Sequence, residues 1–248
     1  MSTSATDLGR ATRLDLRFDD PLTDAATVQR ITSAGSGSYD ISVVTSGGGG
    51  LVTQPGRHGG VDRALRFPPF APVIAGPRAV IRVSATGPTD DLNPGPAPFT
   101  FGADIRLASP SQSSAGDDDG NNVVQRGLYA DPTQYKLEVD EGLATCRVKG
   151  STGDVLVTSK TPIDPGTWYR LRCLRDSDSV TLTVIRWSAD GSTTRSQDHE
   201  TGATGDLTPP TPGVPLTVGG KLSSDGATIE AQSDQFNGMI DNVVLEIG

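Results

Sequence analysis

The side chains that most often perform catalysis are scarce in this sequence. Its two histidines, His58 and His199, lie in glycine-rich or polar stretches, without a serine or cysteine nucleophile motif nearby and without a Gly-x-Ser-x-Gly turn. The two cysteines, Cys146 and Cys173, lie far apart and show neither Cys-x-x-Cys spacing nor a matching histidine pair. This pattern excludes zinc knuckles and thioredoxin-like redox motifs, and it leaves one disulfide or two buried thiols. We therefore expect a protein that is not an enzyme.

Recognition of a sugar is better supported, by the segment from Trp168 to Trp187. In a pair of strands with alternating side chains, one face of this segment is apolar and the other carries Trp168, Arg170, Arg172 and Trp187. A two-residue turn would place Trp168 opposite Trp187, and a different loop length would make them diagonal neighbours. Aromatic rings stack on sugar rings, and guanidinium groups bind hydroxyls or carboxylates. The sequence predicts a ligand-binding site on this face; the alternative is that Trp168 packs under a loop.

Elements that could position these residues are short and alternate between apolar and polar side chains. Ten segments have the period of a half-buried strand: 14–18, 64–67, 79–83, 99–107, 135–139, 144–148, 155–158, 168–174, 180–187 and 239–247. Turn formers separate them, and no stretch of about a dozen residues has a helical period. This pattern predicts an all-β protein with two antiparallel sheets packed face to face.

Composition and charge argue against several fold classes and classes of binding partner. The 248 residues include 30 Gly and 18 Pro, which argues against a helical bundle. A net charge of −9 disfavours nucleic acid, and no apolar run reaches the ~20 residues that cross a bilayer, so we expect no membrane insertion. No secretory signal pattern is visible at the N-terminus.

The domain organisation follows from the absence of a long linker. We expect residues 1–11 to be a flexible N-terminal segment and residues 12–248 to form a single domain. Three tracts read as surface loops of that domain, namely the glycine run 47–50, the polar tract 109–122 and the proline-rich tract 208–215.

The order of the segments is also informative. The first half contains Phe18-Asp-Asp-Pro21, a glycine-rich stretch at 56–60, Arg63–Phe67 and Pro98–Arg106. The second half contains Gln125-Arg-Gly127, Tyr135–Gly142, Gly166–Arg172, Val180–Val184, Leu216–Gly219 and Phe236–Val243. This succession resembles the laminin G-like, or concanavalin A-like, jelly-roll domains, and the cysteine placement resembles secreted actinobacterial members. The resemblance implies a two-sheet antiparallel jelly-roll β-sandwich of about twelve to fourteen strands.

The resemblance implies a disulfide between Cys146 and Cys173. In the related secreted proteins the corresponding strands carry a cysteine pair. Alternation places Cys146 with Ala144 and Val148, and Cys173 with Leu171, so both thiols should point into the core. A disulfide between them would stabilise the fold by about 3 to 4 kcal/mol outside a reducing cell.

The catalytic pattern of related glycoside hydrolases is broken here. Laminarinase-type members carry Glu-x-Asp-x-x-Glu, which supplies carboxylates about 5 to 5.5 Å apart for retaining hydrolysis. Glu138 and Asp140 begin such a pattern, but Leu143 stands at the position of the last acid. We interpret Glu138 and Asp140 as solvated side chains of an outer face.

A structural calcium ion is a further expectation. The acidic run at 117–122 does not fit an EF-hand loop, because Asn122 and Leu128 occupy the positions of the required Gly and Glu. Asp20 and Asp241 fit better: parity places each on the core face, and the resemblance implies that the two terminal strands pair. Their carboxylates would then converge at one edge, where backbone carbonyls could complete a shell of about six to eight oxygens. The alternative is that both acids stabilise turns.

The sequence thus favours a noncatalytic recognition module that binds glycan or a protein partner, located outside the cell or on a cell or virion surface. The first alternative is a structural accessory protein, such as a phage virion decoration or tail component, for which an oligomer or larger assembly is expected. An atypical polysaccharide hydrolase or lyase ranks third.

Overall fold

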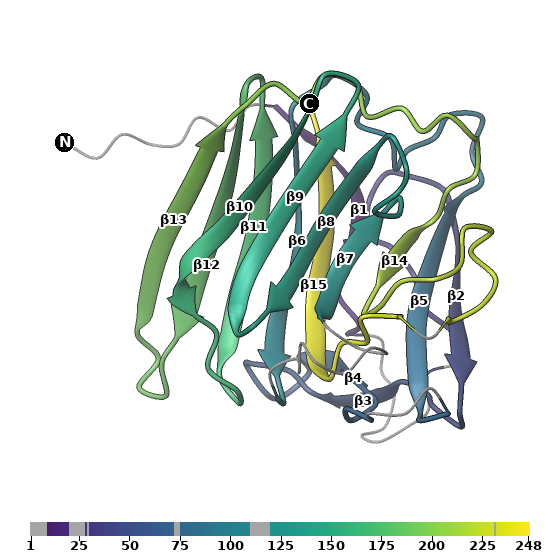
Figure 1. Cartoon of the computed structure of the whole chain (residues 1–248). Helices are drawn as coiled ribbons and strands as arrows, with labels where there is room; N and C mark the ends of the chain where they lie inside the picture. The colour runs from purple at the N-terminus through teal and green to yellow at the C-terminus, as the bar shows by residue number, and fades with distance from the viewer. Residues whose placement is uncertain (1–8, 20–27, 29, 72–74, 110–119, 231) are drawn as a thin grey trace.

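The computed structural model describes residues 9–19, 28, 30–71, 75–109, 120–230 and 232–248 (Figure 1). Within this part of the chain the molecule is all-β, and no helix is long or apolar enough to cross a membrane. The strands of the first half are β1 (Ala11–Leu16), β2 (Tyr39–Ser46), β3 (Val52–Pro55), β4 (Arg63–Phe67), β5 (Arg78–Ala85), β6 (Phe99–Leu107) and β7 (Asn121–Arg126). Those of the second half are β8 (Gln134–Asp140), β9 (Leu143–Gly150), β10 (Gly153–Pro162), β11 (Trp168–Asp176), β12 (Ser179–Trp187), β13 (Thr193–Thr201), β14 (Leu216–Val218) and β15 (Gly238–Ile247).

The strands form two antiparallel sheets stacked face to face (Figure 1). Sheet A has the order β13-β12-β11-β6-β15-β4-β3, with β1 also paired to β15. Sheet B has the order β10-β9-β8-β7-β14-β5-β2 and lies nearer the viewer in Figure 1. The predicted jelly-roll β-sandwich is confirmed, with fifteen strands among the described residues instead of about twelve to fourteen.

The core lies between the sheets, where alternate side chains of both meet. In β11, Tyr169, Leu171 and Cys173 are fully buried, while the residues between them are partly exposed. In β8, Tyr135 packs its ring against Phe99 and Phe101 of sheet A. This alternation leaves each sheet an outer face that can carry polar groups.

A disulfide crosses the core. Cys146 on β9 of sheet B is joined to Cys173 on β11 of sheet A, and both residues are fully buried as the parity argument predicts. The bond therefore links the two sheets directly.

All ten expected segments contain strands, although the first strand ends at Leu16 and Phe18 has a left-handed φ of 59°, and other strands were not predicted from the sequence. β2, β3 and β13 were not anticipated, and the tract 109–122 contains the start of β7 at Asn121. β13 is polar on both faces, so it lacks the alternation used to recognise a strand, and it places His199 in a strand and not in a loop. Residues 1–8 of the predicted flexible segment lie outside the described residues, and Ala11 already pairs with Ile247.

Candidate ligand-binding faces

The outer face of sheet A contains the four residues predicted to bind a ligand. β11 and β12 pair with Arg170 opposite Ile185 and Tyr169 opposite Arg186, as a two-residue turn at 177–178 requires. Trp168, Arg170, Arg172 and Trp187 are each partly exposed on this face. The structure thus brings the four residues to neighbouring positions.

The two arginines already have partners within the chain. Arg170 donates two hydrogen bonds to the carboxylate of Asp104 on β6, at 2.7 and 2.8 Å. Arg172 lies 3.4 Å from the same carboxylate and donates a hydrogen bond to the carbonyl of Asn242 at 3.3 Å. Burial lowers the pKa of Arg172 to about 10. These guanidinium groups stabilise the sheet, and the prediction that they bind a ligand stays a prediction.

Trp187 is covered by the β3–β4 loop, residues 56–62. The Arg57 guanidinium lies 3.9 Å from the centre of the Trp187 ring, and Arg170 lies 5.4 Å from it. Because β11, β6, β15 and β4 separate β12 from β3 in the sheet, this loop must cross the outer face of sheet A to reach Trp187. The ring face that a sugar would use is therefore occupied by a cation of the same chain.

Asp241 also lies on this outer face, which corrects the sequence prediction that it shares the core face with Val243. β15 contains a bulge against β6: Asp241 pairs with Asp104, whereas Val244 pairs with Gly102. The extra residue is Asn242, whose φ of 48° is left-handed. Parity counting from Val243 fails across a bulge, because Ile240 and Val243 both face the core while Asp241 points outward.

The burial of Asp241 alters its ionisation. The residue is only 2% exposed, and burial raises the pKa of its carboxyl group to about 8, with Asp62 and Asp104 adding to the effect. Its two oxygens accept hydrogen bonds from the backbone and side-chain nitrogens of Asn242, at 2.7 and 2.8 Å.

The predicted calcium site requires that β1 and β15 pair and that Asp20 lie near Asp241. β1 and β15 pair antiparallel as expected, with Leu16 opposite Val243. Asp20 lies outside the described residues, and in the described part of the chain no three acidic, histidine or cysteine side chains gather as a metal site. The two Asp241 oxygens already accept hydrogen bonds from Asn242, and the calcium ion at Asp20 and Asp241 stays a prediction.

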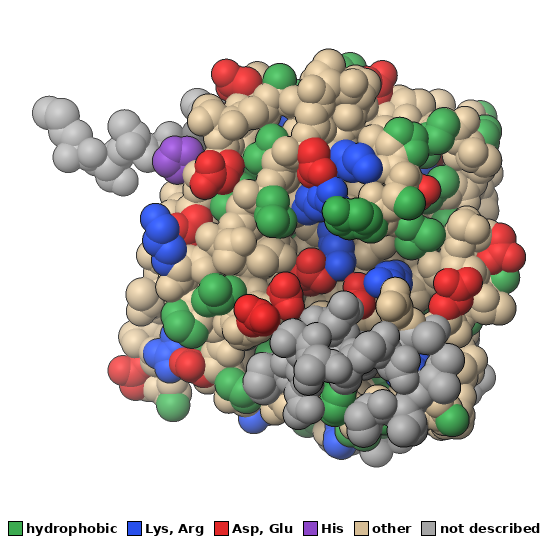
Figure 2. All heavy atoms as spheres, viewed as in Figure 1, with side chains coloured by type: hydrophobic (Ala, Val, Ile, Leu, Met, Phe, Trp, Pro, Cys, Tyr) green, Lys and Arg blue, Asp and Glu red, His purple; other side chains and the backbone are tan. Residues whose placement is uncertain are grey.

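The outer face of sheet B is more open. Strand register places Gln125, Lys136, Arg147 and Leu156 side by side, one from each of β7, β8, β9 and β10. A groove of 420 Å³ lies over this row. Figure 2 looks onto this face, where basic, acidic and hydrophobic side chains lie close together near its middle.

Two exposed hydrophobic side chains line the groove. Tyr129, in the β7–β8 turn, is 77% exposed, and Leu156 on β10 is 56% exposed. The Arg147 guanidinium lies 4.4 Å from the centre of the Tyr129 ring and positions that ring beside the groove. An exposed aromatic ring next to amide and charged groups is a common arrangement for binding sugars.

The floor of the groove is a network of ion pairs. Lys136 lies 2.5 Å from Glu138 and 3.2 Å from Asp234, and Lys221 lies 3.0 Å from Asp234. Glu138 is thus ion-paired and largely buried, not solvated as expected, and burial raises the pKa of its carboxyl group. Arg147 donates a hydrogen bond of 2.9 Å to Asp154, and this bond holds the pKa of Asp154 below its usual value.

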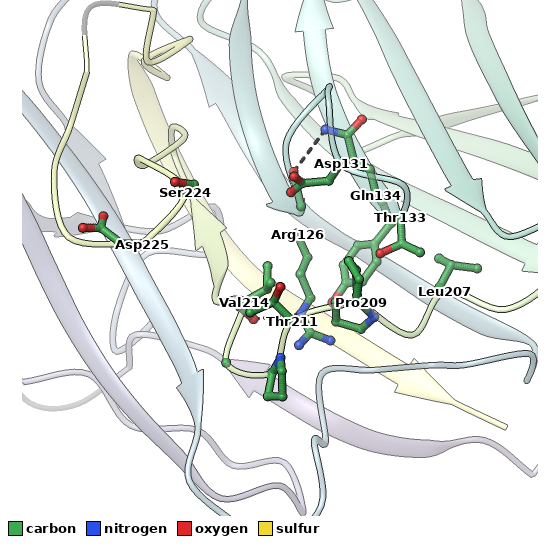
Figure 3. A pocket seen from close by; sticks show the side chains of 15 residues that line it. Arg126, Asp131, Thr133, Gln134, Leu207, Pro209, Thr211, Val214, Ser224 and Asp225 are labelled. Carbon is green, nitrogen blue, oxygen red and sulfur yellow. Dashed lines mark hydrogen bonds between the residues drawn. The ribbon is translucent and has the colours of Figure 1, made fainter.

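A second cavity of 440 Å³ adjoins the groove at the rim of the sheet, and Gln134 lines both (Figure 3). We call it the rim pocket. One wall is the proline-rich stretch from Pro209 to Val214, and the opposite wall contains Arg126, Thr133 and Tyr135. Proline fixes φ and removes a backbone donor, so this wall is stiff and offers mainly carbonyl and apolar surface. The proline-rich tract, expected to be a solvated loop, thus forms part of a pocket.

The sequence reading missed the residues of this face. Tyr129 lies in a turn between two strands, where periodicity carries no information about its neighbours. Gln125, Lys136, Arg147 and Leu156 become a row only through the pairing of four strands. A partial signal was available, because Lys136 and Arg147 both alternate with core residues on adjacent expected strands.

Comparison with known proteins supports the fold assignment. Residues 126–247 match the family model of the laminin G domain, which confirms the resemblance to laminin G-like domains. No curated protein matches the chain.

Two solved structures share the fold at low identity. The binding domain of Paraclostridial Mosquitocidal Protein 1 is similar with a TM-score of 0.58 and 12% identity, over 95% of this chain and 48% of that one. Botulinum neurotoxin type C, which depends upon interaction with two ganglioside molecules to enter cells, is similar with a TM-score of 0.57 and 10% identity, over 95% of this chain and 47% of that one. This chain thus spans about half the length of each.

Proposed function

We propose that this protein is a noncatalytic recognition module that binds a glycan on the outer face of sheet B. The observation that carries the proposal is the Tyr129 ring, which is 77% exposed and lies against Arg147 beside the groove of 420 Å³. Leaving such a ring in water is unfavourable, and stacking on a pyranose ring would cover it.

The laminin G match and the similarity to two toxin proteins support a binding role. The mosquitocidal protein's domain is a binding domain, and the neurotoxin interacts with gangliosides, which carry sugars. Because a fold hosts many functions, the proposal rests on the face itself and takes only support from these relatives.

The groove favours binding over hydrolysis. Glu138, the first residue of the broken hydrolase pattern, is ion-paired with Lys136 and lies in the groove floor. Its partner Asp140 is next along the same face of β8, but Leu143 replaces the third acid of the pattern. Retaining hydrolysis requires both a nucleophile and an acid, and the broken pattern lacks the last of its acids.

A glycan array probed with the labelled protein, followed by calorimetry on the best hits, tests this proposal. We expect binding to a defined glycan class, and Tyr129→Ala should weaken it about tenfold or more, as the loss of one stacking contact of ~1.4 kcal/mol predicts. Two controls are available: Val61→Ala removes another exposed hydrophobic side chain, in the β3–β4 loop, and Trp168→Ala alters the outer face of sheet A.

Both controls should retain affinity within about twofold. An array without hits, or a loss of binding in Trp168→Ala but not in Tyr129→Ala, would contradict the proposal.

A further inference from the structure

We infer that the glycan bound on sheet B is an uncharged saccharide and not a sulfated, sialylated or uronic acid-containing one. This inference rests on the proposed function. It comes from the charges that line the groove and the rim pocket.

The cations that line the groove are all paired with carboxylates. Lys136 contacts Glu138 and Asp234, and Lys221 contacts Asp234. Arg147 is held by Asp154, as described above, and stacks on Tyr129. Three cations therefore face three carboxylates within this part of the described chain, and the local charge sums to about zero.

The rim pocket is no more favourable for an anion. Arg126 is the one cation among the described residues that line it; the residue is 4% exposed and forms an ion pair of 2.5 Å with Asp90. It also donates a hydrogen bond of 3.0 Å to the carbonyl of Val214. The carboxylates of Asp131 and Asp225 line the same pocket. An anionic sugar would meet these acids without gaining a cation.

Sulfate and carboxylate groups are bound mainly by unpaired Arg or Lys, often with two parallel hydrogen bonds. An anion entering this site would have to displace an existing carboxylate and leave that carboxylate unpaired, which is costly. The net charge of −9 on the whole chain adds a long-range repulsion.

Sugar hydroxyls meet no such obstacle. A hydroxyl both donates and accepts, so it can donate to a spare carboxylate lone pair of Asp154 or Asp131 and accept from the amides of Gln134 or Gln125 without breaking an ion pair. The apolar face of a pyranose ring can lie on Tyr129, and the proline wall of the rim pocket can cover a neighbouring ring. Because the two cavities share Gln134, one oligosaccharide could lie in both.

The test compares matched neutral and anionic probes on the full chain. The array should contain pairs that share a core, such as lactose and 3′-sialyllactose, with neutral gluco- and manno-oligosaccharides and heparin hexasaccharides, each at low and at high NaCl. We expect neutral hits whose affinity changes less than about twofold with salt, and weaker binding of the sialylated partner. Hits confined to sulfated or sialylated glycans, with affinity that falls steeply with salt, would overturn this inference while the proposed function stands. An array without hits would overturn both.

A single substitution sharpens the test. Asp154→Asn releases the Arg147 guanidinium without removing the Tyr129 ring, and Asp154 is exposed enough for the variant to fold. We expect this variant to gain salt-dependent binding of heparin hexasaccharide and to lose about fivefold or more in affinity for the neutral hit. Asp40→Asn is the matched control, because Asp40 pairs with Arg82 on β2 and β5 at the opposite edge of the same sheet.

The control should bind as the unchanged protein does, and circular dichroism should show that both variants are folded. If Asp154→Asn binds the neutral and anionic probes as the unchanged protein does, the ion pairs do not determine the ligand class and the inference fails.

Discussion

The outer faces of the two sheets carry similar side chains but use them differently. On sheet A, Arg57 covers Trp187, Asp104 holds Arg170, and Asp241 is almost completely buried. On sheet B, Tyr129 and Leu156 remain exposed beside a groove. Aromatic rings and arginines occur on both faces, so the difference lies in what covers the rings. On sheet A a loop of the same chain places Arg57 over Trp187, whereas on sheet B the Tyr129 side chain lies beside Arg147 and stays 77% exposed.

Residue type alone does not distinguish a binding face from a structural one. An arginine beside a tryptophan reads the same in the sequence whether a ligand or a loop occupies the ring. Two properties distinguish the faces: the exposed fraction of the aromatic side chain and the number of carboxylates that pair with the neighbouring arginine. Both depend on residues that are far away in the chain.

A large effect on stability is expected from the disulfide, which joins the two sheets through the core. Replacing both Cys146 and Cys173 by Ala should lower the free energy of unfolding by about 3.5 kcal/mol, because a closed loop of 27 residues no longer restricts the unfolded chain. Urea denaturation followed by tryptophan fluorescence and circular dichroism measures the loss, and the unchanged protein in reducing agent should match the variant.

We expect both probes to report one transition, since the sheets share a core. Two separate transitions would show that the faces unfold independently, and a loss below about 1 kcal/mol would show that the bond contributes little.

The next effect is a pH dependence of the free energy of unfolding, which comes from Asp241 on the outer face of sheet A. The pKa of Asp241 is raised to about 8 in the fold, whereas an unfolded Asp titrates near ~3.9. Between these values the folded protein retains a proton that the unfolded chain has lost. The stabilising contribution is therefore complete below pH ~4 and is lost as the pH rises through about 8, at up to ~1.4 kcal/mol per pH unit.

Asp241→Asn should abolish this contribution, because an amide does not titrate. Thermal unfolding from pH 4 to 9 should show the melting temperature of the unchanged protein falling relative to that of Asp241→Asn as the pH rises from 4 to about 8. Asp40→Asn, which replaces an exposed carboxylate, should follow the unchanged protein. Parallel curves for Asp241→Asn and the unchanged protein would show that Asp241 titrates normally.

A smaller effect tests whether the β3–β4 loop is held by the Trp187 ring. A double-mutant cycle with Arg57→Ala and Trp187→Ala should give a coupling of about 0.5 to 1 kcal/mol, the usual strength of a cation–π contact that is partly exposed. Chemical denaturation of the four proteins measures it. Additive losses would mean that the loop crosses the face without being held there by this contact.

The smallest effect on the free energy of unfolding is expected at Tyr129, on the outer face of sheet B. Tyr129→Ala should change the free energy of unfolding by less than about 0.5 kcal/mol, because the side chain is 77% exposed. The same variant is expected to lose glycan binding, so stability and affinity should separate on sheet B. A loss of stability above 1 kcal/mol would show that Tyr129 is a structural residue, as Trp187 is on the other face.

Much of the fold could be predicted because alternation is a local property. The register of the β11–β12 hairpin follows from its turn, and the burial of Cys146 and Cys173 follows from counting along two regular strands. Counting fails at Asp241, because one inserted residue, Asn242, reverses the parity, and nothing in the side-chain pattern marks a bulge before the partner strand is known.

The candidate site was harder to predict than the fold. Gln125, Lys136 and Arg147 come from three strands, and their neighbourhood depends on pairings that alternation does not specify. Tyr129 lies in a turn, where the fold and not the local sequence determines what surrounds the ring. The polar strand β13 was missed for a related reason, since its pairing with β12 compensates for the lack of an apolar face.

The β3–β4 loop also has a consequence for the order of folding events. Its contact with Trp187 joins the first quarter of the chain to the start of the last quarter, and the loop crosses strands from both halves of the sequence. Closing so long a stretch of chain is entropically slow, and the surface on which the loop rests exists only after β6, β11, β12 and β15 have assembled. The loop should therefore settle late, as the last layer over a sheet that is already formed, and the amides beneath it should gain their full protection from hydrogen exchange only at that final step.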